Sequence, residues 1–324
     1  MQKVKWGVLG TANIAQGCTI PGMQLADNCE LYAIAGRSAK KAEEFKEKFG
    51  FKKFYGSYDE LLEDENVEAV YVPLPNGIHF QWVKAALEHK KHVLCEKPMA
   101  LCAEDAGNLY KIAEANGVIL MEAYACLHSP YIKSLKDDIA SGIIGKVDYI
   151  ESAFVTQGYK EDIRLYKDQG GGAMYDLGCY CTTMILSLNE DEPEYVKAVA
   201  EFSDKDVDVM TSAIIRFKNG VRAAFNVGMI LGEDTHSRND SLYVHGDKGC
   251  IRSAVEFNQS GDLSYKICTD TGVIERKVSA PQNYSLEVTQ LGKCILDGEK
   301  PLVSPAFSVK NSELMDMVLK EIGY

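Results

Sequence analysis

The sequence is informative first through what it lacks. It has no apolar run near the ~18 residues of a membrane-spanning helix, no Cys-x-x-Cys pair and no excess of positive charge. Its 35 lysines and arginines are outnumbered by 47 aspartates and glutamates, which gives a formal net charge of −12. An acidic surface repels phosphate backbones and anionic headgroups, so we expect neither nucleic acid nor membrane among its partners. A small phosphate in a local basic pocket stays compatible with this charge.

The ten cysteines are scattered through apolar surroundings, and only Cys179 and Cys181 stand close together. Further metal-ligating partners are lacking near this pair, so we predict no metal site. A strand is expected from Val4 onward, which leaves no room for a secretory leader. We therefore expect reduced thiols in a cytoplasmic protein.

At about 150 residues per domain, 324 residues predict two domains. In the first half, short apolar runs alternate with helical segments of 10–15 residues, which indicates a parallel sheet covered on both faces. The expected strands are Val4–Leu9, Glu30–Gly36, Ala69–Val72, His92–Cys95 and Ile119–Glu122. The sequence thus predicts an α/β, doubly wound nucleotide-binding domain over residues 1–123.

From about residue 124 the pattern changes to longer alternating stretches separated by turn signals such as Lys218-Asn219-Gly220. Such stretches are typical of antiparallel hairpins. Two expected helices, Tyr284–Leu296 and Ser308–Ile322, close the chain. Residues 124–324 are therefore predicted to form an α+β domain with a large, mostly antiparallel sheet.

A glycine-rich turn follows the first expected strand. Its residues are Gly10, Thr11, Ala12, Asn13, Ile14 and Ala15. Gly10 permits the tight turn, Ala12 still lets a pyrophosphate approach, and Ala15 allows close packing of helix on sheet. The N–H groups at the helix start favour an anion. We therefore predict a dinucleotide site.

The second expected strand ends at Arg37 and Ser38, with Lys40 and Lys41 behind. A site specific for NAD usually carries a carboxylate here, and this sequence has none. Arg37, Ser38 and Lys41 are suited to a 2′-phosphate, which favours NADP, with NAD as the second option. The simpler interpretation is that Ser38 caps a helix and that Lys40 is solvated.

Two further motifs carry the candidate chemistry. Pro98 stops the strand His92–Cys95 and fixes the turn that follows it. Lys97 in this turn is therefore expected at the carboxyl edge of the sheet, where it can donate to a substrate oxygen. Gly170–Gly172 opens a helix where backbone can approach a ligand, and Asp176 and Tyr180 are four residues apart on it. Tyr180, with lysine support, is a competent acid–base. A surface Glu-Lys pair and a core tyrosine are the simpler alternatives.

The motifs GTANIA, AGRS, PLPNGIH, EKP and GGGAMYDLGCY, in this order, resemble those of the Gfo/Idh/MocA oxidoreductases. The resemblance covers essentially the whole chain. It is greatest to the branch of dimeric dihydrodiol dehydrogenase and D-xylose dehydrogenase, which also carries tyrosine at the last motif position. It implies that Lys97 and Tyr180 form the catalytic pair and that Asp176 orients the substrate.

The same resemblance implies further site residues. Pro75, Asn76, His79 and Glu96 would belong to the cofactor side of the site, although a histidine at a helix start is more often structural. Arg164 would lie near cofactor and substrate, and Tyr124 near substrate. The stretch from Glu122 to His128 lacks the aromatic–Arg pair of relatives, which puts the identity of a sugar substrate in doubt.

The sequence therefore predicts hydride transfer between a nicotinamide and a carbinol or carbonyl carbon of a sugar, polyol or cyclic diol. One alternative is an oxidative glycosidase that retains and recycles its cofactor. A second is a cofactor-binding regulator without catalysis, which the presence of Lys97 and Tyr180 disfavours. The sheet of the second domain needs cover on one face, so we expect a homodimer or homotetramer.

Overall fold

The computed structural model describes residues 2–233 and 235–324, which fall into two compact units. The first contains residues up to 128 and residues 281–309, and the second contains residues 129–280 and 310–324. The first unit thus extends beyond the expected boundary at residue 123, and it includes a segment from near the C-terminus. No helix of the described residues is long and apolar enough to cross a membrane.

The first unit is built on a six-stranded sheet in the order β3-β2-β1-β4-β5-β6, and every neighbouring pair is parallel. Its strands are β1 (Val4–Leu9), β2 (Cys29–Ala35), β3 (Lys53–Tyr55), β4 (Ala69–Val72), β5 (His92–Glu96) and β6 (Leu120–Ala123). The predicted doubly wound sheet is confirmed. Strand β3 was not predicted, because three residues are too short for a periodic signal.

The helices of this unit begin and end where local chemistry predicts. They are α1 (Ile20–Leu25), α2 (Ala39–Phe49), α3 (Tyr58–Glu63), α4 (His79–Glu88), α5 (Ala103–Asn116) and α8 (Asn283–Asp297). The hydroxyls of Ser38 and Ser57 cap α2 and α3 by accepting the N–H of Lys41 and Glu60. Gly50 ends α2 with a φ of +81°, a conformation that glycine adopts without strain.

A helix from near the C-terminus completes the first unit. Helix α8 packs against α1, and a Cβ atom at Gly22 would lie 2.8 Å from the backbone nitrogen of Ser285. The side chain of Asn28 donates to the carbonyl oxygen of Thr289 over 2.9 Å. The close approach of the two backbones and a hydrogen bond between segments far apart in the sequence explain why residues 281–309 belong with the nucleotide-binding sheet.

The second unit is built on an eight-stranded sheet in the order β14-β13-β12-β11-β7-β10-β9-β8. Its strands are β7 (Val147–Gln157), β8 (Pro193–Phe202), β9 (Asp208–Phe217), β10 (Arg222–Leu231), β11 (Arg238–Gly246), β12 (Gly249–Ser253), β13 (Gly261–Thr269) and β14 (Gly272–Ala280). Among the described strand pairs of this second sheet, only β7–β10 is parallel. The predicted mostly antiparallel sheet is confirmed.

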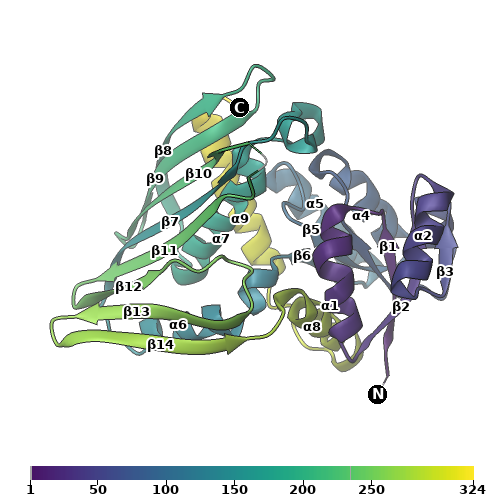
Figure 1. Cartoon of the computed structure of the whole chain (residues 1–324), viewed down its shortest axis with the longest axis horizontal. Helices are drawn as coiled ribbons and strands as arrows, with labels where there is room; N and C mark the ends of the chain where they lie inside the picture. Colours follow the sequence, from purple (N-terminus) through teal and green to yellow (C-terminus); the bar gives the residue numbers. More distant parts are fainter. Residues whose placement is uncertain (1, 234) are drawn as a thin grey trace. The chain divides into compact units, whose positions relative to one another are not determined.

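Helices pack on one face of this sheet (Figure 1). They are α6 (Pro130–Ala140), α7 (Cys179–Leu188) and the larger part of α9 (Pro305–Ile322). Burial alternates along the strands, as expected when only one face is covered. The other face exposes large apolar side chains on β8 and β9, among them Val199 and Ile214.

Candidate active site

The glycine-rich turn has the geometry that its sequence predicts. Gly10 has a φ of +117°, and its N–H donates to the carbonyl oxygen of Ala35 over 2.8 Å. A Cβ atom at Gly10 would lie 3.0 Å from the side chain of Leu74. Thr11 and Ala12 follow as a half-exposed turn, and helical structure begins at Asn13. The backbone N–H groups at the start of this helix can therefore bind an anion.

The helix after this turn contains a π-helical turn, Ala15–Thr19, in which the N–H of Ile20 bonds to the carbonyl oxygen of Ala15. Pro21 then lies in the first turn of α1. A proline inside a helix usually interrupts it, but here helical structure runs on to Leu25. The hydrogen-bond pattern already shifts at the π-helical turn, so the N–H that proline lacks falls where α1 starts.

The residues after β2 lie beside the glycine-rich turn. A Cβ atom at Gly36 would lie 3.5 Å from Cγ2 of Thr11. Arg37 is exposed, and its charge lowers the pKa of Tyr58, although burial dominates and raises that pKa overall. The Ser38 hydroxyl accepts the N–H of Lys41 over 3.4 Å, so its capping role is confirmed. Its own proton stays available for donation to a phosphate.

The loop after β4 divides into open and buried residues. Pro75 and Asn76 are half-buried, whereas His79 has no exposed surface. The Nδ1 atom of His79 lies 2.8 Å from the carbonyl oxygen of Pro98, and Nε2 lies 2.7 Å from that of Leu74. Burial lowers the pKa of His79. His79 thus joins two loops, as the simpler interpretation holds, and offers no surface to a cofactor.

Glu96 and Lys97 lie at the carboxyl end of β5, where Lys97 is half-buried. The Tyr71 hydroxyl donates to Oε1 of Glu96 over 2.5 Å, and the Thr19 hydroxyl donates to Tyr71 over 2.8 Å. The carboxylate of Glu96 therefore faces the interior, and the backbone N–H of Lys97 contacts its other oxygen at 3.3 Å. These contacts anchor the turn that carries Lys97, and the cofactor role of Glu96 stays a prediction.

A second buried acid lies near Glu96. Glu287 on α8 is fully buried, and neither of its carboxyl oxygens has a hydrogen-bond partner among the described residues. Burial, together with the negative charge of Glu96, raises the pKa of Glu287 well above its usual range. Both effects favour the protonated form of Glu287. No sequence pattern points to this residue, because an isolated glutamate in a helix is usually solvated.

Glu122 on β6 and Tyr124, which directly follows this strand, are both buried. Oε1 of Glu122 accepts the N–H of Met99 over 2.9 Å. Burial raises the pKa of Glu122 to about 7, although the charge of Lys97 acts in the opposite direction. Tyr124 has no exposed surface. Its predicted contact with substrate therefore has no support in the structure, since a core side chain cannot reach a ligand without moving.

In the second unit, two glycines of the Gly170–Gly172 run, Gly171 and Gly172, let other parts of the chain approach closely. A Cβ atom at Gly171 would lie 2.4 Å from the carbonyl oxygen of Arg164, and one at Gly172 would lie 2.2 Å from Oδ1 of Asp208. Asp208 is fully buried and accepts the N–H of Met174 over 2.9 Å. The close approach that we expected of a ligand is thus made by backbone and by a buried carboxylate.

Asp176 lies in a second π-helical turn, Met174–Gly178. Its Oδ2 accepts the Nε–H of Arg164 over 2.6 Å, and Nη1 of Arg164 donates to Asp162 over 3.0 Å. The charge of Asp176 raises the pKa of the Arg164 guanidinium. The predicted α-helical spacing of Asp176 and Tyr180 is modified by the wider turn, a distortion often found at functional sites.

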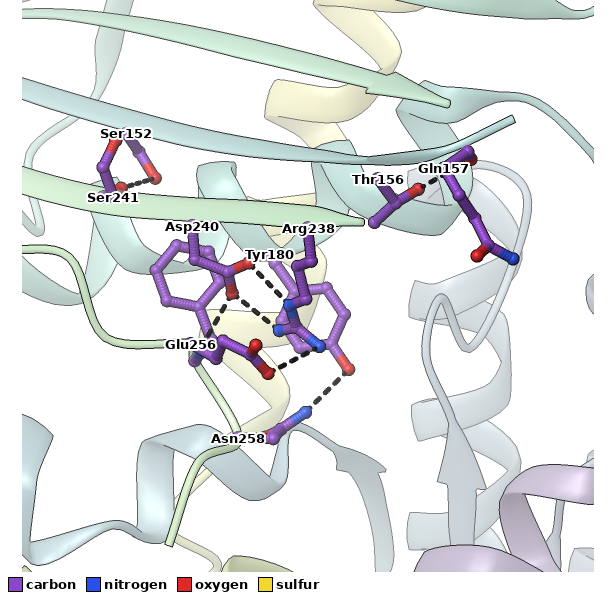
Figure 2. A network of polar contacts seen from close by, with 10 residues as sticks. Ser152, Thr156, Gln157, Tyr180, Arg238, Asp240, Ser241, Glu256 and Asn258 are labelled. Carbon is purple, nitrogen blue, oxygen red and sulfur yellow. Dashed lines mark hydrogen bonds and ion pairs between the residues drawn. The ribbon is translucent and has the colours of Figure 1, made fainter. Parts of the chain in front are cut away.

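Tyr180 on α7 combines an apolar ring with a polar end. Its ring stacks on Phe257 at 6.3 Å and lies 5.4 Å from that of Phe154. The Asn258 amide donates to the Tyr180 hydroxyl over 3.2 Å, as Figure 2 shows. The guanidinium of Arg238, in the same network, lies 4.3 Å from the centre of the Phe154 ring.

Arg238 is held by carboxylates on either side (Figure 2). Two hydrogen bonds of 2.6 Å join it to Asp240, and Glu256 lies 3.6 Å away. Burial alone would lower the pKa of this guanidinium, but the bonds to Asp240 and the charges of Asp240, Glu256 and Tyr180 raise it. We missed both Asn258 and Arg238 in the sequence, since a loop asparagine and a strand arginine form no local motif.

The described residues contain no group of three or more His, Cys, Asp or Glu side chains that could hold a metal ion. The chemical groups available are thus a helix start for a pyrophosphate, cations for a phosphate, a lysine and a tyrosine. These are the groups that hydride transfer to or from a bound dinucleotide requires of a protein.

Two family models match the chain. The first, for an oxidoreductase family with an NAD-binding Rossmann fold (GFO/IDH/MocA), matches residues 4–124. The second, for the GFO/IDH/MocA C-terminal domain, matches residues 132–252.

Relatives match over nearly the full length. D-xylose 1-dehydrogenase (NADP(+)) 2 of Haloferax volcanii is 30% identical over 97% of this chain and 95% of its own. Trans-1,2-dihydrobenzene-1,2-diol dehydrogenase of Xenopus tropicalis is 29% identical over 98% of both chains. The structure of KijD10, a 3-ketoreductase from Actinomadura kijaniata in complex with NADP and TDP-benzene, has a TM-score of 0.93. It is 29% identical and covers 99% of this chain and 98% of its own. Further structures of KijD10 with NADP carry a replaced tyrosine or a replaced lysine.

The raised pKa of Glu122 predicts a pH-dependent stability. Between its ordinary value of 4.5 and about 7, the unfolded chain releases the proton while the folded chain keeps it. The free energy of unfolding therefore falls as pH rises through this window, by roughly 3 kcal/mol. Glu122→Gln should remove this fall. Urea unfolding of the wild type and the variant at pH 5 and pH 8 measures this change. If the free energies of unfolding of the two proteins differ by the same amount at both pH values, the prediction is wrong.

Proposed function

We propose that this chain, which belongs to the GFO/IDH/MocA family of oxidoreductases, transfers a hydride between NADP and a carbinol or carbonyl carbon of a sugar or cyclic diol. The observation that carries the proposal is the hydroxyl of Tyr180. It receives the N–H of Asn258 and lies in the field of Arg238, at the end of an otherwise apolar ring. A phenol in these surroundings is suited to exchange a proton.

The substrate class rests on the relatives. Xylose, a dideoxyhexose derivative and a dihydrobenzenediol are the substrates that their names give, for enzymes that share 29–31% identity with this chain. In all three, the carbon that reacts belongs to a ring and is bonded to a second ring carbon that also carries an oxygen. The Arg164–Asp176 pair suits this pattern, because a carboxylate fixed by an arginine accepts the hydrogen bond of a neighbouring hydroxyl.

The cofactor fits the residues of the first unit. Gly10 and the helix start at Asn13 would hold the pyrophosphate, and the exposed Arg37 would pair with a 2′-phosphate. Ser38 and Lys41 would add a hydroxyl donor and a second positive charge. Xylose dehydrogenase and KijD10, which are named or solved with NADP, support this choice over NAD.

In the proposed mechanism the cofactor, when bound, supplies the hydride chemistry. Tyr180 takes the proton of the substrate hydroxyl during oxidation and returns it during reduction. Lys97 stabilises the negative charge that develops on the substrate oxygen. The roles of Asn258 and Arg238 are to hold the Tyr180 hydroxyl and to favour its deprotonated form through a hydrogen bond and a positive charge.

We also propose that a second copy of the chain covers the part of the open sheet face that β8 and β9 form. Val199 is 72% exposed and Ile214 is 54% exposed, on the neighbouring strands β8 and β9. Large apolar side chains gathered on a flat sheet are typical of an interface between subunits.

Replacing Lys97 by Met or Tyr180 by Phe should each lower turnover by roughly 10²–10⁴-fold while NADPH binding stays intact. Absorbance of NADPH with a panel of aldoses, inositols and trans-diols measures turnover, and fluorescence titration measures binding. Lys84→Met and Tyr175→Phe are the matched controls and should keep near-normal turnover. Normal turnover in either catalytic-site variant would refute the assignment.

Asn258→Ala should lower kcat by roughly tenfold, because the Tyr180 hydroxyl loses a hydrogen-bond donor. The pH profile of the oxidation should move to higher pH, since the deprotonated phenol is less stabilised. Steady-state kinetics across pH measure both, with Gln259→Ala as the control at the next position. A loss of rate with an unmoved profile would limit Asn258 to a packing role.

Arg37→Ala should weaken NADPH binding by roughly 10–100-fold and leave NADH binding almost unchanged, because only NADPH carries the 2′-phosphate. Equilibrium titration with both cofactors gives the ratio, and Lys40→Ala serves as the control cation. If NADH binds more tightly than NADPH and Arg37→Ala leaves the ratio unchanged, the cofactor assignment is wrong.

The double variant Val199→Asp, Ile214→Asp should convert the native assembly to monomers, since two buried carboxylates per subunit are costly in an interface. Sedimentation velocity at micromolar concentration measures the mass. Val273→Asp, on the distant strand β14, should leave the assembly unchanged. A wild-type chain that already sediments as a monomer would exclude the interface.

A further inference from the structure

Two cysteines face each other on neighbouring strands of the second unit. The antiparallel register of β12 and β13 puts Cys250 directly opposite Cys268. Side chains of opposed residues project from the same face of the sheet, with Cα atoms about 4.5–5.5 Å apart. A disulfide needs Cα atoms about 4.4–6.8 Å apart, so this register satisfies it. Both residues are free thiols in the structure.

The pair projects from the open face of the sheet. The residues next to it in each strand, Ile251 and Ile267, are fully buried toward the helices. Successive residues of a strand point to opposite faces, so both thiols point away from the core. Both cysteines are half-buried, which leaves them within reach of a small oxidant.

Two cations lie near the thiols on the open face, with Glu275 of β14 opposite one of them, Lys266. Arg252 lies two residues after Cys250 on the same face, with Lys266 opposite it in the register. The hydrogen bond of Arg252 to the Cys250 sulfur, and then the charges of both cysteines, raise the pKa of this guanidinium. This contact places a cation beside the Cys250 sulfur. The remaining cross-strand neighbours of the pair are His245 on β11 and Val273 on β14.

We propose that Cys250 and Cys268 form a modification site that hydroperoxides oxidise to a cross-strand disulfide. The Cys250 thiolate attacks one peroxide oxygen, so that an S–O bond forms and the O–O bond breaks. The sulfur is oxidised to a sulfenic acid, and the released hydroxide takes a proton to become water. Cys268 then attacks the sulfenic sulfur, the S–O bond breaks, and a second water leaves. Two thiols and one hydrogen peroxide give one disulfide and two waters.

The site is independent of the proposed oxidoreductase function, because it uses neither the cofactor turn nor Tyr180. It also lies on β12 and β13, away from the apolar residues of β8 and β9. A failure of either proposal therefore leaves the other unaffected.

The test treats the reduced, full-length protein with one equivalent of hydrogen peroxide, blocks the remaining thiols by alkylation and digests it with trypsin. Cleavage after Lys248, Arg252, Lys266 and Arg276 isolates the two cysteines on separate peptides, residues 249–252 and 267–276. We expect these peptides to be joined, with a mass two hydrogens below their sum, and to separate on reduction. Alkylated, unjoined peptides after peroxide would overturn the proposal.

Three variants assign the roles. In Cys268→Ser the reaction should stop at the sulfenic acid, which dimedone traps on Cys250. Arg252→Gln should slow peroxide oxidation several-fold, and an unchanged rate would overturn the role of Arg252. Cys102→Ser, a half-buried cysteine of the first unit, is the matched control and should leave the joined peptides unchanged. If dimedone does not label Cys250 in Cys268→Ser, the proposed order of the two steps is wrong.

Discussion

Parallel pairing of β1, β2, β4 and β5 is the constraint on which the first unit depends. Because these strands run in one direction and lie side by side, their carboxyl ends meet at one edge of the sheet. The segments that leave these ends begin at Gly10, Gly36, Pro73 and Lys97. A turn for a pyrophosphate, a cation and a lysine therefore come to one edge from positions far apart in the sequence.

Two buried acids, Glu96 and Glu287, lie in the interior of the same unit. Glu96 is fixed by Tyr71, and Tyr71 by Thr19 of the helix that follows the glycine-rich turn. This chain of hydrogen bonds connects the cofactor turn with the turn of Lys97. Glu287 adds a buried acid from α8, the helix from near the C-terminus that is part of the same unit. Burial and the negative charge of Glu96 both raise the pKa of Glu287, so they favour its protonated form.

The sequence predicted what depends on local chemistry. The bounds of β1, the cap at Ser38 and the turn at Gly10 follow from spacing and residue type, and the structure confirms them. It did not predict what depends on tertiary packing. His79 and Tyr124 look like ligand-facing residues in a motif, yet both are fully buried. Asn258 and Asp208 act on helices distant from them in the sequence, so no local pattern could identify them.

Tyr180 shows why a core interpretation and a chemical one can both hold for one residue. Its ring is 8% exposed and packs between Phe154 and Phe257, as a core tyrosine would. Its hydroxyl, at the other end, meets an amide and the field of a guanidinium. The apolar contacts fix the direction of the ring, so the hydroxyl keeps one position. Burial of the ring would thus hold a single oxygen where the proposed mechanism needs it.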